Sequence, residues 1–93
     1  MDTFARIPEI TTLLQYLYLG NSVQYTRKGV ITRLYMTSAG RVMVHDDEHE
    51  TDRFMGLNLI TLIHIIDHLK TTDDWMNIKT KLTCQSIQQT ERP

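Results

Sequence analysis

Cysteine, proline and glycine are scarce in this chain, which contains one, two and four of them in 93 residues. The single cysteine, Cys84, cannot form an internal disulfide, and the chain opens on Met1-Asp2 without the basic and then apolar segments of a secretory leader. We therefore expect a reducing, cytoplasmic location.

Neither sign of charge is in excess, because 10 lysines and arginines face 11 aspartates and glutamates. The net charge therefore gives no attraction to nucleic acid or to an anionic membrane, and such binding would need a local cluster of basic residues. The most apolar stretch, residues 57–66, is interrupted by polar residues and is too short to span a membrane. The hydrophobic fraction of 41% and charged fraction of 23% predict one soluble, folded domain.

Catalytic and cofactor motifs are also missing from the sequence. No phosphate-binding glycine loop and no serine nucleophile elbow occurs, and Cys84 has no histidine beside it. His64 and His68 have a spacing that can share a metal ion on a helix, but Ile65 stands where a zinc hydrolase carries glutamate, and no third ligand is evident. We predict a non-enzymatic protein without a cofactor, a metal or catalytic residues.

Helical periodicity is clearest near the N-terminus. Ile10, Leu13 and Leu17 recur at helical spacing, Pro8 suits a first helical turn, and Gly20 suits the residue after a helix end. The pattern predicts a helix over residues 8–19.

Residues 22–46 are rich in Val, Ile, Thr and Tyr and contain two glycine turns, at residues 27–29 and 38–40. They predict a three-stranded antiparallel meander. If each turn has three residues with glycine in the left-handed position, Thr26 pairs with Val30 and Thr37 pairs with Arg41.

This register assigns the side chains of the meander to two faces. The predicted core face combines with a helical stripe, and the predicted core is Leu34, Met36, Val42, Val44, Leu62, Ile63 and Ile66. The opposite face carries Val23, Tyr25, Ile31, Arg33, Tyr35, Met43 and His45. That face is more apolar than solvent exposure requires, so either a helix of the same chain covers it or it is an interface.

The second half of the chain predicts a loop, two helices and a tail. Residues 45–52 are acidic and lack apolar periodicity, which is typical of a loop. A helix capped by Asn58 or Thr51 should end near Lys70, and a short helix should begin at residues 72–74. Residues 84–93 are polar and predict a frayed tail after a compact domain of residues 1–83.

The predicted fold is therefore α+β, in the order helix, three-stranded antiparallel β-meander, helix and short C-terminal helix. The predicted function is a small protein-binding or regulatory module that docks on another protein, with a homodimer through the sheet as an alternative. The candidate contact residues are Tyr25, Arg33, Tyr35 and Met43, and the acidic residues Asp46, Asp47 and Glu48 would steer a basic partner.

A nucleic-acid-binding regulator is the alternative function. The basic residues of the predicted hairpins, with the two tyrosines, could form a phosphate-binding and base-stacking platform; they are Arg27, Lys28, Arg33, Arg41, Tyr25 and Tyr35. The acidic run after the third strand disfavours that function, because carboxylates repel phosphate.

Overall fold

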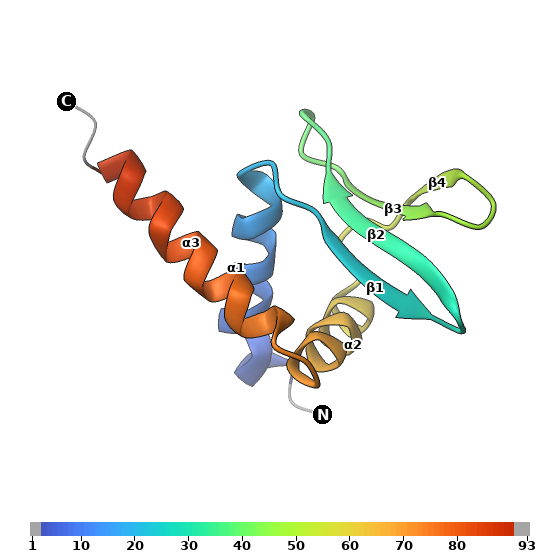
Figure 1. The fold of residues 1–93 in the computed structure, drawn as a ribbon, viewed down its shortest axis with the longest axis horizontal. Helices are drawn as coiled ribbons and strands as arrows, with labels where there is room; N and C mark the ends of the chain where they lie inside the picture. The colour runs from blue at the N-terminus through green and yellow to red at the C-terminus, as the bar shows by residue number, and fades with distance from the viewer. Residues whose placement is uncertain (1–2, 91–93) are drawn as a thin grey trace.

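The fold is α+β, with the helices on one side of an antiparallel sheet (Figure 1). The computed structural model describes residues 3–90, and the side chains of residues 3–84. A 3₁₀ turn at Phe4–Arg6 leads into helix α1 at Ile7–Tyr18. The strands are β1 at Val23–Arg27, β2 at Val30–Met36, β3 at Val42–Asp46 and β4 at Thr51–Phe54. Helices α2 at Leu59–Lys70 and α3 at Asp74–Thr90 follow.

One hydrophobic core lies between the helices and the sheet. Helix α1 contacts β2, α2 contacts β1, and α3 packs on the other two helices. The fully buried side chains are Leu13, Leu17, Leu34, Leu62, Ile63, Ile66 and Leu69. The predicted core is confirmed, with Met36 partly buried at its margin. Among the described residues, no helix is long and apolar enough to cross a membrane.

Helix α1 matches its prediction to within one residue at each end. Pro8 lies in its first turn, where a missing N–H loses no helical hydrogen bond. Ile10, Leu13 and Leu17 are buried along one face. Gly20 adopts a φ of 95°, the left-handed conformation that suits glycine after a helix end.

The register of the first hairpin differs from the prediction. Arg27 pairs with Val30, so the turn contains only two residues, Lys28 and Gly29, with φ of 53° and 79°. Two successive positive φ values are the geometry of a two-residue hairpin turn whose twist matches that of the strands. Because side chains alternate along a strand, this shift of one residue moves every β1 side chain to the other face of the sheet.

The second hairpin has the predicted register. Leu34 lies opposite Val44, and Met36 lies opposite Val42. The Thr37 amide donates to the Arg41 carbonyl at 2.9 Å, and Gly40 adopts a φ of 81° in the turn. The three-residue turn with a left-handed glycine is therefore confirmed here.

The sheet has four strands, so the prediction of three is wrong. Strand β4 lies within and just after the acidic run that predicted a loop, and it pairs with β3 in the order β1-β2-β3-β4. All four β4 residues are exposed, and none supplies the apolar alternation that marks a strand. The turn is closed instead by Asp46, whose carboxylate accepts hydrogen bonds from the amides of Glu48 and His49.

Helix α2 begins at one of its two predicted caps, Asn58, while the other, Thr51, lies in β4; helix α3 begins as predicted. Asn58 caps α2, with its side-chain oxygen accepting from the Thr61 amide at 3.1 Å. Trp75 and Ile78 of α3 are buried, and Leu82 is half-buried. Helix α3 is longer than the predicted short helix, because its backbone continues through Thr90 into the segment predicted as a tail. The last three residues of that predicted tail, 91–93, lie outside the described part of the chain.

Candidate interaction surfaces

The outer face of the sheet is the face turned away from the three helices (Figure 1). Its side chains come from all four strands, and those with apolar, aromatic or charged groups are Ile31, Arg33, Tyr35, Met43, His45, Asp52 and Phe54. Ile31 is 44% exposed and Phe54 is 65% exposed. Helices of the same chain therefore leave this apolar surface open to solvent.

Three of the four predicted contact residues lie together on the outer face. Tyr35 and Met43 are cross-strand partners, and both are half-buried. Arg33 is exposed two residues before Tyr35 on the same strand, so it projects from the same face.

Tyr25 does not belong to this surface, and the prediction that placed it there is wrong. It pairs with Thr32 rather than Ile31, so its ring faces the helices. The side chain is only 7% exposed. The two-residue turn at Lys28 and Gly29 is the cause, because it reverses the faces of β1.

A hydrogen-bonded cluster fixes Tyr35 on the outer face. Its hydroxyl donates to the Asp52 carboxylate at 2.9 Å, and His45 Nδ1 lies 3.1 Å from the same oxygen. His45 Nε2 lies 3.2 Å from an Asp47 carboxylate oxygen. The hydrogen bond to Asp52 raises the pKa of Tyr35 above its ordinary value, because the neutral phenol is the donor.

Asp52 and Phe54 are surface residues that sequence reasoning missed, because it did not predict β4.

The charge along the outer face is uneven. The guanidinium of Arg41 lies over the ring of Phe54, 5.9 Å from its centroid. Asp47 and Glu48 are exposed in the turn at the other end of β3. The surface therefore has an aromatic and apolar centre between a basic end and an acidic end.

The three predicted steering acids are not equivalent. The Asp46 carboxylate is occupied within the turn, and its second oxygen lies 2.9 Å from His49 Nδ1. That hydrogen bond lowers the pKa of Asp46 and raises the pKa of His49. Asp47, which also contacts His45, and Glu48 are both exposed, whereas Asp46 is half-buried, so these two acids are the better candidates for meeting a basic partner.

The basic residues predicted as a nucleic-acid platform are divided between the two faces. Arg33 is on the outer face with Tyr35, whereas Arg27 accompanies Tyr25 on the helix side. There, Tyr25, Arg27 and Arg53 line a cavity of about 280 Å³ beside the first turn of α2, which we call the Tyr25 cavity. Sequence reasoning missed Arg53 at this position because it belongs to β4.

The histidine pair and the cysteine form no metal-binding or nucleophilic cluster in the described structure. His64 and His68 are both exposed on α2, and Cys84 is exposed on α3. Within the side chains described, no group of three His, Cys, Asp or Glu residues could hold a metal ion.

Comparison with known proteins adds no assignment. No family model matches the chain, and no curated protein or solved structure matches it. The functional argument therefore depends on the geometry of its own surfaces.

Proposed function

We propose that this chain is a small, non-enzymatic protein-binding or regulatory module that docks on another protein through the outer face of its sheet. The observation that carries the proposal is that Tyr35, Met43 and Phe54 share one sheet face that is open to solvent. Tyrosine, methionine and arginine are the residue types enriched at the centres of protein interfaces. We place this activity in the cytoplasm, where one unpaired cysteine is compatible with the reducing conditions.

Preorganisation supports Tyr35 as the central anchor. Because Asp52 already accepts its hydroxyl hydrogen bond, little rotamer freedom remains for binding to remove. Arg33, on the same strand, adds a cation whose long side chain can cover apolar partner surface. Asp47 and Glu48 at the acidic end favour a partner with a basic patch.

Nucleic acid is the second candidate ligand, favoured by the concentration of Arg27, Lys28 and Arg53 around the end of the sheet. The two functions differ in their response to salt. Phosphate contacts release counterions and weaken steeply with ionic strength, whereas an interface centred on aromatic and apolar groups weakens much less. They also use opposite faces of the sheet, so variants can separate them.

The test is affinity capture from the cells of origin by the wild-type chain, Tyr35→Ala and a surface control, Lys79→Ala on α3. We expect a protein that the wild type and the control capture and Tyr35→Ala loses, with retention at 0.5 M salt. Light scattering of the purified chain, with and without Tyr35→Ala, shows whether the captured partner is a second copy. Equal capture by all three chains, or recovery of nucleic acid alone, would contradict the proposal.

A further inference from the structure

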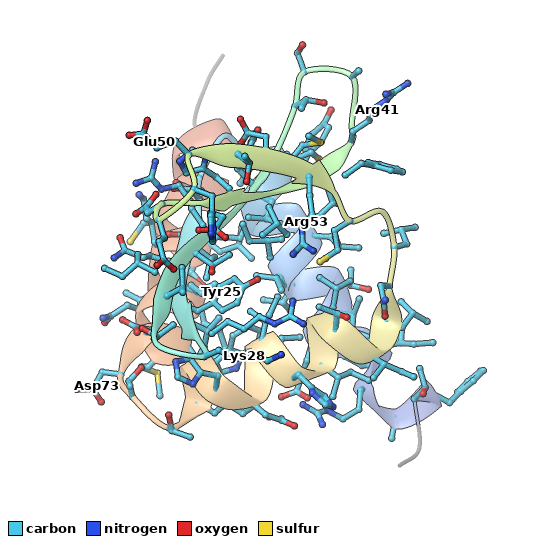
Figure 2. The ribbon with its side chains drawn as sticks, turned by 90° about the vertical axis from the view of Figure 1, so that its right-hand side faces the viewer. Tyr25, Lys28, Arg41, Glu50, Arg53 and Asp73 are labelled. Atoms are coloured by element: carbon cyan, nitrogen blue, oxygen red, sulfur yellow. The ribbon has the colours of Figure 1, made fainter. Side chains whose placement is uncertain are left out.

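Two arginines, on the edge strands β1 and β4, lie near the Tyr25 side chain. Arg27 is two residues after Tyr25 on β1, so both side chains face the helices. Arg53 of β4 lies opposite Val44, whose buried side chain also faces the helices. All three line the Tyr25 cavity. Figure 2 shows Tyr25 between Arg53 and Lys28 on the side of the molecule that faces the viewer.

The Tyr25 hydroxyl makes no hydrogen bond to any residue whose side chain the structure describes. The residue as a whole is 7% exposed, and because no buried side-chain polar atom among the described residues lacks a partner, the hydroxyl itself is open to solvent. Burial raises the pKa of this phenol, whereas the charges of Arg27 and Arg53 act in the opposite direction. Both guanidiniums are therefore within electrostatic reach of a hydroxyl that remains available to a ligand.

The positive charge around this hydroxyl is also uncompensated. Neither Arg27 nor Arg53 forms an ion pair with a carboxylate in the part of the chain whose side chains are described. Both arginines are exposed, so water and salt screen their mutual repulsion, while an anion in the cavity would be attracted by both. The arrangement therefore suits a ligand with concentrated negative charge.

The first turn of α2 borders the same cavity. Asn58 and Thr61 line the Tyr25 cavity. The Asn58 side chain accepts from the Thr61 amide, and the Asn58 carbonyl accepts from the Leu62 amide. The amides of Leu59 and Ile60 thus remain as donors without an acceptor in the helix, at the positive end of its dipole.

Two apolar residues, Val44 and Met55, also line the cavity, and its volume of about 280 Å³ leaves room for more than an isolated anion. A neighbouring cavity of about 310 Å³ brings Lys28 next to Arg27 and Arg53. Asp46 lines that second cavity, but its carboxylate is already bound by His49 and two backbone amides.

We propose that the Tyr25 cavity binds the terminal phosphate of a small phosphate monoester. The guanidiniums of Arg27 and Arg53 bind the phosphate oxygens, the Tyr25 hydroxyl donates to a third, and the carbon-bearing part lies against Val44 and Met55. A monoester dianion matches two guanidiniums and a helix N-terminus better than a carboxylate with one charge. Phe54 lines this cavity as well as the outer face, but Tyr25, Arg27 and Arg53 do not belong to the outer face, so either proposal can fail alone.

A terminal phosphate fits this cavity better than a nucleic-acid backbone. A phosphodiester carries one charge, whereas a terminal phosphate monoester carries close to two at neutral pH. The second charge matches the two guanidiniums of Arg27 and Arg53 that line the cavity.

Phenyl phosphate is the probe, titrated into the full chain by calorimetry and by amide NMR. We expect saturable 1:1 binding with the largest shifts at the amides of Leu59 and Ile60. Benzoate, which has the same ring and one charge, should bind at least about tenfold more weakly. Phenyl phosphate affinity should fall as pH decreases below about 6, because the phosphate then loses its second charge.

Three variants and one control assign the site. Arg27→Gln and Arg53→Gln should each weaken binding at least about tenfold, as expected for losing a hydrogen bond between charged groups. Tyr25→Phe keeps the buried ring and removes only the hydroxyl, and it should weaken binding by about three- to tenfold. Lys79→Gln removes one exposed charge on α3 and should leave affinity within about twofold.

Three outcomes would overturn the proposal. The first is no saturable binding by the wild-type chain, and the second is a loss with Lys79→Gln equal to that of the arginine variants, which indicates general charge attraction. The third is a single-stranded oligonucleotide without a terminal phosphate that binds more tightly than phenyl phosphate and depends on the same residues. If an arginine variant fails to fold, the comparison of Tyr25→Phe with the wild type still decides the question.

Discussion

Arg6 and Asp67 form an ion pair that joins the start of α1 to α2, with 2.6 Å between Arg6 Nη2 and Asp67 Oδ1 across 61 residues of sequence. Arg6 also contacts Glu9, and Lys70 pairs with the other Glu9 oxygen. The hydrogen bond from Lys70 is the main reason that the pKa of Glu9 is lowered, and the bond from Arg6 is the main reason for Asp67. Two helices far apart in sequence are thus connected through alternating charges.

This network predicts how stability depends on pH. The carboxyl groups of Glu9 and Asp67 each have a lower pKa in the folded chain than in the unfolded chain. Their contribution to the free energy of unfolding is therefore present above the ordinary pKa values near 4, and it is lost as pH falls through the lowered pKa values. Urea unfolding between pH 7 and 2 should show this decline. Arg6→Gln should make it shallower, while Lys79→Gln should not. Identical pH profiles for Arg6→Gln and the wild type would show that the ion pairs made by Arg6 contribute nothing to stability.

We expect large losses in the free energy of unfolding when a core residue on either side of the sheet–helix interface is truncated. Leu34 of β2 and Ile63 of α2 are fully buried. Truncation of either to alanine should lower the free energy of unfolding by about 2–5 kcal/mol, through lost burial and the cavity left behind. Ile60→Ala is the control, because Ile60 is 63% exposed, and it should cost less than about 0.5 kcal/mol. Similar losses for Ile60 and Ile63 would mean that α2 presents a different face to the sheet.

The first hairpin turn predicts a stabilising substitution. Lys28 adopts a φ of 53°, which costs a residue with a Cβ about 1 kcal/mol and suits asparagine before glycine. Lys28→Asn should raise the free energy of unfolding by about 0.5–1 kcal/mol, measured by thermal or urea unfolding. Lys28→Ala is the control for losing the charge and should give no such gain. Stabilisation by both variants would indicate charge repulsion rather than backbone strain.

The same turn explains which parts of the structure the sequence could predict. The helices follow from apolar spacing, and the second hairpin follows from a glycine that closes a three-residue turn, with Thr37 opposite Arg41. The first turn has an equally placed glycine, but Lys28 also takes a positive φ, which residue type does not indicate. That one difference decides the face on which Tyr25 lies.

Strand β4 could not be predicted, for a different reason. Its residues bury no side chain, so hydrophobic periodicity carries no information about it. Its position depends on Asp46 closing the turn and on the pairing of Met43 with Phe54. Both candidate surfaces depend on this strand, since Asp52 supports Tyr35 on one face and Arg53 approaches Tyr25 on the other. The sequence did predict that one sheet face carries Arg33, Tyr35 and Met43, because it predicted the register of β2 with β3.

The β3–β4 turn predicts a shifted histidine titration. The hydrogen bond to Asp46 raises the pKa of His49 above its ordinary 6.5. The attraction between Asp46 and protonated His49 is therefore fully present just below pH 6.5, and it is lost as pH rises through the raised pKa of His49. At much lower pH the attraction is lost again, because Asp46 becomes protonated. An NMR titration of the His49 ring should show a midpoint above 6.5 that falls towards 6.5 in Asp46→Asn. Asp52→Asn, which leaves Asp46 intact, should preserve the raised midpoint.

We expect substitutions at the centre of the outer face and at its acidic end to change different rate constants of partner binding. An anchor in the middle of an interface mainly slows dissociation, whereas exposed charges at its margin mainly speed association. Once a partner is captured, Tyr35→Ala should accelerate dissociation about thirtyfold, equivalent to about 2 kcal/mol, with little change in association rate. The double variant Asp47→Asn, Glu48→Gln should instead slow association, and added salt should reproduce that effect on the wild-type chain.

Tyr35→Phe makes this kinetic prediction specific. It keeps the ring on the outer face and removes the hydroxyl that donates to Asp52. If the ring supplies the contact and Asp52 only positions it, Tyr35→Phe should accelerate dissociation far less than Tyr35→Ala. Surface plasmon resonance measures both rates on the same captured partner. An unchanged dissociation rate in Tyr35→Ala, with circular dichroism showing an intact fold, would exclude the outer face as the docking surface.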